Sequence, residues 1–204
     1  MAHFSENGST LEIIHSLVKS RDELLSVCKN LSDVCVIVLP ASQNSSQLDQ
    51  PLQGVGELVT EASKNLGETA TLVVLGEVID LVQVQAQMSD TAMYQHWIAI
   101  KRESVVDGNR RKLPHQHFGA LVYTRYQTSL RHTKTRTKYT YCPVCDKTTK
   151  DYGGKKHTYH EAGTLISDVW RDIACELNGD LSPVIQRFAD LFGVEPYKTL
   201  TVID

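Results

Sequence analysis

Apolar and polar positions alternate along this chain in blocks that predict strands and helices in turn. Residues 33–39 and 69–75 are near-continuous apolar runs rich in β-branched side chains, which is typical of strands buried on both faces. Residues 94–101 and 118–124 predict two more strands, and residues 200–203 begin a further one. The strand signals are therefore spread over the whole chain.

Three stretches have apolar residues at helical spacing. Residues 9–30 are predicted to form the first helix, with a capping box that starts at Ser9. Residues 51–66 predict the second helix, which begins with a proline suited to the first turn. The third helix is expected to start at Ser182 as the N-cap, because a proline follows directly.

Three other segments have weaker signals. Residues 77–88 are compatible with either a helix or an extended segment, and residues 163–177 are only ambiguously helical. Residues 102–113 are polar and are expected to form a loop. These segments leave the overall alternation of strands and helices unchanged.

Buried strands that alternate with helices predict an α/β fold, with a Rossmann-like, mostly parallel sheet flanked by helices on both faces. One basic segment interrupts the alternation. We expect residues 1–124 to form an α/β region, residues 125–162 an insertion, and residues 163–204 a return to the α/β core. In such sheets, ligands bind at the carboxyl ends of the strands.

Charge is distributed unevenly along the chain. The net charge of the chain is −3, but residues 125–160 contain nine basic and two acidic residues. This segment therefore has a charge of +7, and the remainder of the chain has a charge of −10. A basic island on an acidic body favours contact with a polyanion over the alternative of a merely solvated loop. The predicted nucleic-acid-binding residues are Arg131, Lys134, Arg136, Lys138, Lys147, Lys150, Lys155 and Lys156.

The same basic segment has the spacing of a zinc site. Cys142 and Cys145 form a Cys-x2-Cys pair, and His157 and His160 follow as a His-x2-His pair. Four such ligands predict a structural zinc with no open position, which would order a polar loop. His132 is an alternative ligand, and two reduced cysteines beside ordinary surface histidines remain the simpler interpretation. Tyrosines interleaved with the basic residues are suited to stack on bases or to pack around the metal.

Composition limits the cellular setting. The five cysteines include only one close pair, which argues against a disulfide framework. No apolar run approaches the length of a membrane span, and the first residues lack the pattern of a secretory signal. We therefore expect a cytoplasmic protein of one domain with no membrane partner.

The order of these segments resembles that of the DNA amino-methyltransferases, which modify adenine N6 or cytosine N4. The resemblance is to the permuted members, in which the catalytic half comes first, a target-recognition region follows and the cofactor-binding half comes last. The segments that carry it are 33–42, 56–76, 94–101, 117–125, 163–171 with its Asp-Val-Trp, and 182–204. It covers most of the chain, and its last two segments have the more specific residues.

The resemblance implies two sites. The family's catalytic tetrapeptide holds the target amino group with a polar side chain and stacks an aromatic ring on the flipped base. At the corresponding positions stand Leu39, Pro40, Ala41 and Ser42, so that the first offers no side-chain acceptor and the last no ring. Asp204 corresponds to the acidic residue that opens the glycine-rich loop for S-adenosylmethionine. Because the sequence ends there, the loop is expected from a C-terminal extension or a second methyltransferase subunit.

These observations together predict a DNA-binding, methyltransferase-like protein. It is expected to be part of a site-specific DNA methyltransferase of a restriction-modification system, which transfers a methyl group from S-adenosylmethionine to adenine N6 or cytosine N4. Duplex DNA is the expected partner and zinc the expected structural metal. The alternatives are a non-catalytic, zinc-stabilised DNA-binding subunit, and an α/β protein of unrelated function with a zinc-ribbon-like insertion.

Overall fold

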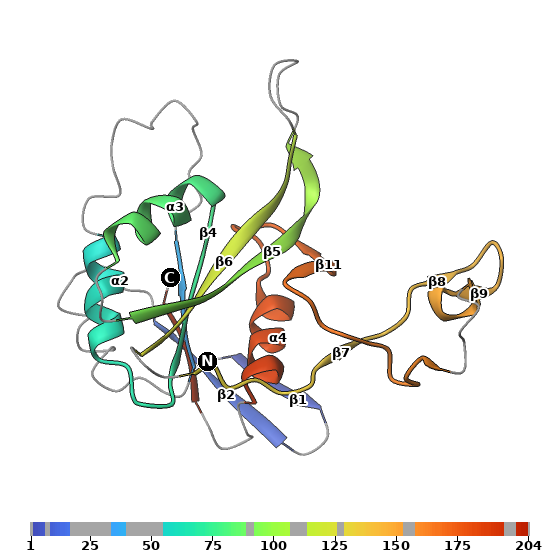
Figure 1. Ribbon diagram of the computed structural model, residues 1–204, viewed down its shortest axis with the longest axis horizontal. Coiled ribbons are helices and arrows are strands. Elements are labelled where there is room, and N and C mark those ends of the chain that lie inside the picture. The colour runs from blue at the N-terminus through green and yellow to red at the C-terminus, as the bar shows by residue number, and fades with distance from the viewer. Residues whose placement is uncertain are drawn as a thin grey trace.

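An eight-stranded mixed sheet forms the centre of the protein (Figure 1). The computed structural model describes residues 2–6, 9–16, 34–39, 55–88, 92–106, 114–125, 129–152, 158–193 and 199–203. The strand order is β1-β2-β12-β3-β4-β6-β5-β11. The strands are β1 (Ala2–Glu6), β2 (Ser9–Ser16), β3 (Val34–Val38), β4 (Thr71–Gly76), β5 (Ala92–Val106), β6 (His115–Arg125), β11 (Val169–Cys175) and β12 (Thr199–Ile203).

Most strands of the sheet are parallel. β12, the last strand in the chain, lies between β2 and β3 and is parallel to both, and β3 is parallel to β4. β6 is antiparallel to its neighbours β4 and β5, and β1 is antiparallel to β2. The expected mostly parallel sheet is therefore confirmed, with an antiparallel strand, β6, in its interior.

The central strands are buried on both faces because their apolar side chains alternate between two cores. In β3, Val34 and Val36 face one core, whereas Cys35 and Ile37 face the other. β4 repeats this arrangement in register, since Val36 pairs with Val73 and Ile37 with Val74. An uninterrupted apolar run is thus the expected sequence for a strand at this position.

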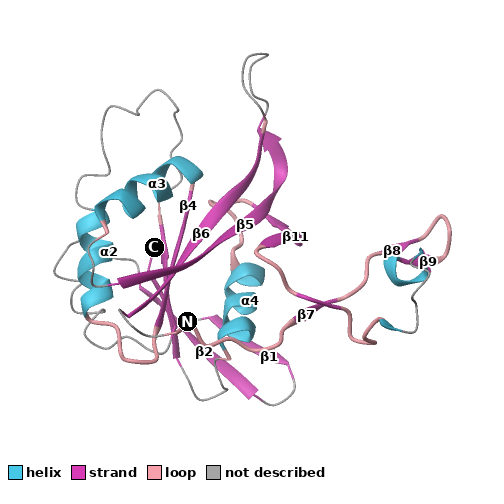
Figure 2. Ribbon diagram, in the orientation of Figure 1, coloured by secondary structure: helices cyan, strands magenta, loops and turns pink. Residues whose placement is uncertain are grey.

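Among the described residues, helices α2, α3 and α4 cover these two faces (Figure 2). Helix α2 (Val55–Lys64) and helix α3 (Val78–Gln87) contribute to one core, and helix α4 (Ser182–Phe192) contributes to the other. The core that α4 covers also contains Trp170 of β11. The ring centroids of Trp170 and Phe188 on α4 are 4.8 Å apart. No helix among the described residues is long and apolar enough to cross a membrane.

Sheet pairing overturns two of the local expectations. Residues 9–16 form strand β2 instead of the start of a helix, because their main chain pairs with β1 on one side and β12 on the other. Residues 17–30 of that expected helix lie outside the described residues. Residues 102–106, expected to be a loop, continue β5 to Val106. Hydrogen bonds between distant strands thus outweigh local helical periodicity.

The ambiguous segments are decided by tertiary contacts. Residues 78–87 are helical, as α3, whereas residues 169–175 form strand β11 beside β5. The N-cap of α4 is Leu181, one residue before the expected Ser182. The Ser182 main-chain N–H donates to Asp180 Oδ1 at 2.9 Å, so a carboxylate satisfies this free donor at the helix start.

Phe188→Ala should lower the free energy of unfolding by about 3–5 kcal/mol, because it leaves a cavity in a core that Trp170 cannot refill. Urea unfolding of the full chain would measure the loss. Ile79→Ala is the matched control, since Ile79 also lies on a helix but is 48% exposed. Equal effects of the two substitutions would show that α4 does not close the core.

Candidate nucleic-acid interface

Between β6 and β11 the chain leaves the sheet and forms a projecting arm, of which residues 129–152 and 158–168 are described (Figure 1). The arm leaves through β7 (Arg136–Thr137) and returns through β10 (Thr164–Leu165), which pair antiparallel as its neck. At the tip lie β8 (Tyr141–Cys142), β9 (Lys147–Thr148) and the short helix η1 (Thr149–Tyr152). The arm overlaps the insertion predicted at residues 125–162, and its returning strand β10 lies beyond the predicted end of that insertion.

The base of the arm is attached to the carboxyl end of α4. The Thr133 main-chain N–H donates to the Leu191 carbonyl at 2.7 Å, and the Thr133 hydroxyl donates to the Asp190 carbonyl at 2.6 Å. Carbonyls in the last turn of a helix have no partner within the helix, so the arm satisfies them. The direction in which the arm projects is therefore set by α4.

The neck depends on a glycine in the left-handed region. Gly163 has φ 105°, and a Cβ atom there would collide with the carbonyl oxygen of Thr137 on the facing strand. The Gly163 carbonyl accepts a hydrogen bond from the Arg136 guanidinium at 2.7 Å. Arg136, a predicted nucleic-acid contact, is therefore half-buried and engaged in holding the neck.

The two cysteines of the predicted zinc site lie on one tight turn at the tip. Cys142 ends β8 and Cys145 follows three residues later, with Asp146 at φ 51° closing the turn. Hydrogen bonds from the Cys145 thiol, and from the main-chain N–H groups of Cys145 and Val144, lower the pKa of the Cys142 thiol. A thiolate is the form that a metal binds, so the Cys142 side of this turn fits a metal half-site.

Among the described residues, neither His160 nor His132 gathers with the two cysteines. His160 Nδ1 accepts a hydrogen bond from the Ala162 main-chain N–H at 3.1 Å. The His160 ring would have to give up this hydrogen bond to coordinate a metal. His157 lies outside the described residues. His132 lies at the base, beside the Thr133 that bonds to α4. Within the described part of the chain, no three metal-binding side chains gather.

The arm tip is held by its own polar contacts. The Tyr139 hydroxyl donates to the His160 carbonyl at 2.9 Å, and the rings of Tyr139 and Tyr159 meet edge to face at 6.0 Å. The Tyr141 hydroxyl donates to Asp146 at 2.8 Å. These three tyrosines thus have partners within the arm. This favours a role in packing at the tip over stacking on bases.

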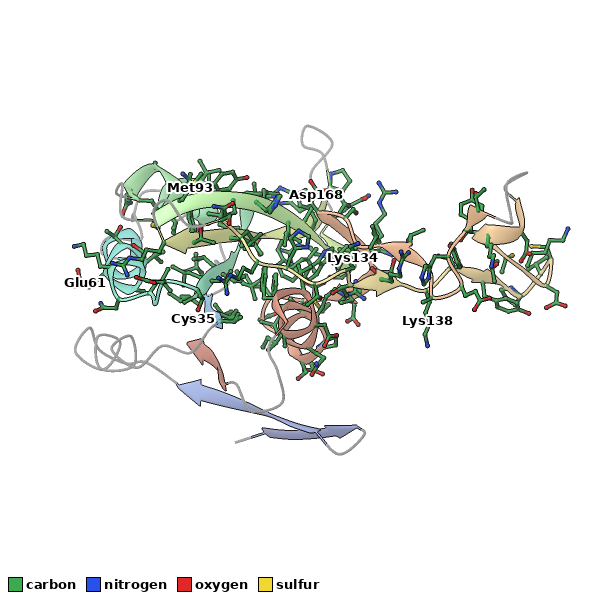
Figure 3. The ribbon with its side chains drawn as sticks, turned by 60° about the horizontal axis from the view of Figure 1, so that its bottom comes forward. Cys35, Glu61, Met93, Lys134, Lys138 and Asp168 are labelled. Carbon is green, nitrogen blue, oxygen red and sulfur yellow. The ribbon has the colours of Figure 1, made fainter. Side chains whose placement is uncertain are left out.

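Four of the six predicted basic contacts that the structure describes are exposed. Arg131, Lys134, Lys138 and Lys147 are exposed, and Lys150 is half-buried. Among the described residues, none of these five side chains has an acidic partner within ion-pair distance. Figure 3 shows Lys138 pointing away from the arm. Lys155 and Lys156 lie outside the described residues. The described arm also contains four acidic residues, Asp146, Asp151, Glu161 and Asp168, against six basic ones, so its net charge is +2.

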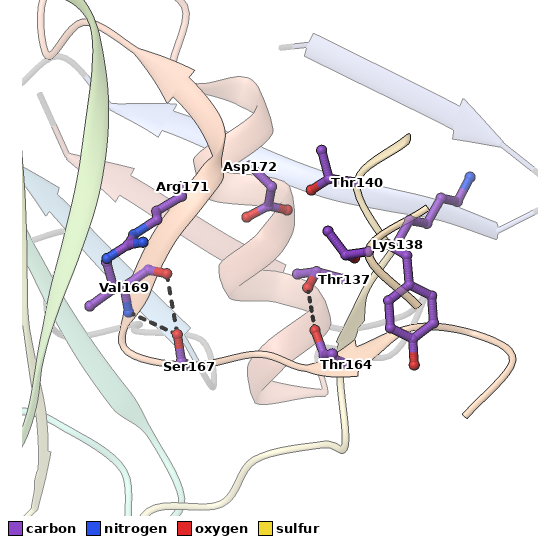
Figure 4. Close-up of a pocket in the computed structure, with 10 residues that line it drawn as sticks. Thr137, Lys138, Thr140, Thr164, Ser167, Val169, Arg171 and Asp172 are labelled. Atoms are coloured by element: carbon purple, nitrogen blue, oxygen red, sulfur yellow. Dashed lines mark hydrogen bonds between the residues drawn. The ribbon is translucent and has the colours of Figure 1, made fainter. Parts of the chain in front are cut away.

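A cleft of about 490 Å³ lies between the neck and β11 (Figure 4). It is polar, with hydroxyl and charged side chains on both walls. Its lining consists of Thr137, Lys138, Tyr139, Thr140, Thr149, Thr164, Ser167, Val169, Arg171 and Asp172. Arg171 and Asp172 are not among the predicted site residues, because the sequence pattern of residues 163–177 leaves their secondary structure ambiguous. A strand assignment would have placed both beside the basic insertion.

The expected catalytic position lies at the carboxyl end of β3. Leu39 is buried, its main-chain N–H donates to the Leu75 carbonyl at 2.8 Å, and its side chain packs over Gly76. The Leu39 side chain therefore fills the core beside β4. The other three residues of the expected tetrapeptide, Pro40, Ala41 and Ser42, lie outside the described residues.

The expected cofactor position lies at the neighbouring strand end. Ile203, the last residue of β12, pairs with Ile37 of β3 and Ser16 of β2. From β3 the chain continues through α2, whereas α4 on the other face leads into β12. The connections of these two neighbouring strands therefore run on opposite faces of the sheet. In α/β sheets, nucleotide-like cofactors bind at the carboxyl ends of strands at such a switch point, so the topology suits S-adenosylmethionine. Asp204 lies outside the described residues.

Comparisons with known proteins agree with this architecture. No family model matches the chain. An 80-residue stretch is 29% identical to the type II methyltransferase M.BamHI of Bacillus amyloliquefaciens, covering 39% of this chain. The match spans about a fifth of that relative, 19% of its length.

Two crystal structures share the fold. The structure of M1.HpyAVI has a TM-score of 0.57 at 7% identity, and the alignment covers 95% of this chain and 91% of that one. The M1.HpyAVI-SAM complex has a TM-score of 0.51 at 9% identity, covering 95% and 93%. At these identities the likeness shows the fold alone. Together with the match in sequence, it confirms the resemblance to the DNA amino-methyltransferases and the Rossmann-like α/β class.

Gly163→Ala should loosen the arm while the core remains folded, because the new Cβ collides with the neck and the backbone is left-handed. Trypsin should cut the arm about tenfold faster than in the wild type, at an unchanged unfolding midpoint of the core. Gly67→Ala is the control, since the nearest atom to its added Cβ is 3.9 Å away. Equal cutting rates for both variants would contradict this role of Gly163.

Proposed function

We propose that this chain is a DNA-binding methyltransferase-like protein and part of a site-specific DNA amino-methyltransferase. The observation that carries the proposal is a positively charged arm attached to a sheet with a methyltransferase fold. The arm offers exposed cations to a polyanion, and the sheet has a cofactor-compatible switch point between β12 and β3. A methyl group transferred to adenine N6 or cytosine N4 is the reaction that the family resemblance suggests.

Duplex DNA would be bound through the arm. Its exposed lysines and arginines would neutralise phosphates and release counterions, which makes affinity fall steeply with salt. Arg136 would act mainly by holding the neck, since its guanidinium already donates to Gly163. Lys155 and Lys156 would add two more phosphate contacts.

S-adenosylmethionine would be held at the carboxyl ends of β12 and β3, with Asp204 as the acidic residue next to the cofactor. When bound, the cofactor supplies the methyl group. Leu39 cannot accept a hydrogen bond from a target amino group, because its side chain is apolar and packs over Gly76. The backbone of residues 39–42, Ser42 or a second methyltransferase subunit would therefore provide the acceptor.

A structural zinc at the arm tip is the second part of the proposal. Cys142 and Cys145 share one tight turn, in which hydrogen bonding lowers the pKa of the Cys142 thiol. His157 and His160 would complete the four ligands, with rotation of His160 away from the Ala162 N–H. Such a metal would order a tip that is otherwise held only by short strands and polar contacts.

One zinc per chain is expected when the protein is purified without chelator, and Cys142→Ser should remove it because thiolate ligands dominate the affinity. Elemental analysis of both proteins measures the metal. Cys175→Ser is the control, since that thiol is buried in the core and burial raises its pKa to about 11. Zinc-free wild-type protein, or full zinc in the Cys142 variant, would contradict the site.

Duplex DNA should bind the full chain with strong salt dependence, and replacing both Lys155 and Lys156 with Ala should lower the salt slope by about two. Fluorescence anisotropy at several salt concentrations measures the slope, and calorimetry with S-adenosylmethionine tests cofactor binding on the same sample. DNA binding without cofactor binding would favour the non-catalytic DNA-binding subunit. Failure to bind duplex DNA would overturn the proposed function.

A further inference from the structure

We propose that the cleft between the neck and β11 binds the sugar-phosphate backbone of one DNA strand, with Arg171 and Lys138 as its phosphate contacts. The proposal rests on the proposed function, because it extends the DNA-binding surface from the basic segment of residues 125–160 to Arg171 on β11. Arg171 comes from the sheet and Lys138 from the arm, so the bound backbone would join the two parts.

The two cations lie on opposite walls of the cleft (Figure 4). Arg171 lies on β11, and Lys138 directly follows β7 in the neck. Both side chains are exposed, and within the described residues neither has an acidic partner at ion-pair distance. The two side chains point away from each other (Figure 4), so they would contact different phosphates of one strand that passes through the cleft, and among the described residues neither contact would break an existing ion pair.

The acidic residue of the cleft does not cancel this charge. Both oxygens of Asp172 accept hydrogen bonds from the Arg187 guanidinium, at 2.8 and 2.6 Å. These bonds hold the pKa of Asp172 below its usual value, so the carboxylate stays ionised and paired. Arg187 is fixed in turn over the ring of Trp170, 5.4 Å from its centroid. The net charge left for a ligand is that of Arg171 and Lys138.

Hydroxyl groups complete the lining. Five of the lining residues are threonine or serine, namely Thr137, Thr140, Thr149, Thr164 and Ser167. Hydroxyls and cations are the groups that bind phosphate and sugar oxygens, whereas base edges are read mainly by amides, guanidinium groups and carboxylates. The Arg171 guanidinium can bind either a phosphate or a guanine, but the lining contains no amide side chain, and its single carboxylate is paired with Arg187. This chemistry favours the backbone over a base and over an apolar ligand.

Such a contact would also position the arm. Phosphate contacts determine where a protein sits on the duplex without reading its sequence. A backbone held between β11 and the neck would place the projecting tip at a set distance from the carboxyl edge of the sheet. The cleft would therefore control register, while the tip remains free to contact the grooves.

The test compares Arg171→Gln and Lys138→Gln, alone and combined, with the wild-type chain on two duplexes of unrelated sequence. Each single variant should bind both duplexes about three- to tenfold more weakly at 0.1 M salt and lower the salt slope by about 0.9. The combined variant should lower the slope by nearly two. Arg171→Lys should retain the wild-type slope, because it keeps the charge. Thermal melting checks that each variant is folded.

Lys64→Gln is the matched control, since it removes one exposed positive charge at the end of α2, away from the arm. The cleft proposal would be overturned if the wild-type chain binds DNA and both Arg171→Gln and Lys138→Gln have the same affinity and salt slope as Lys64→Gln. The proposed function would remain intact in that case. A loss confined to one duplex sequence would indicate base contact and would also overturn it. Wild-type protein that fails to bind either duplex would overturn both proposals.

Discussion

Burial of β3, β4 and β6 on both faces is the constraint on which the rest of the structure depends. Each strand divides its side chains between two cores, so helices must cover both sides of the sheet. α2 and α3 satisfy one side and α4 the other. The carboxyl ends of β12 and β3 are consequently left between the helix layers, which is where this class of sheet binds its ligands.

Helix α4 connects this core to the arm. Phe188 packs on Trp170 in the core, while the last turn of the same helix accepts hydrogen bonds from Thr133 at the base of the arm. Arg187 adds a bidentate ion pair to Asp172 on β11, next to the cleft. A single helix thus stabilises the sheet and orients the basic surface, so disturbance of its core face should be felt at the arm.

Charge is separated from the stabilising contacts. Arg102 is buried and paired with Glu77 and Glu176, and it ties the start of α3 to the end of β11. In the arm, Arg131, Lys134, Lys138 and Lys147 are exposed and, among the described residues, have no acidic partners. Buried charges need partners to offset the loss of hydration, whereas exposed ones stay available for a ligand. The two groups of cations therefore have different roles.

Sequence alone determined the buried strands, the helices at residues 51–66 and from residue 182, and the basic insertion, because uninterrupted β-branched runs, helical periodicity and charge are local properties. It could not assign residues 9–16 or 169–175, since their strand conformation depends on pairing with β12 and β5, which are distant in the sequence. Only the tertiary structure brought Arg171 opposite Lys138, buried Leu39 over Gly76 and engaged Arg136 in the neck. Those positions are decided by contacts between distant segments, which no local pattern encodes.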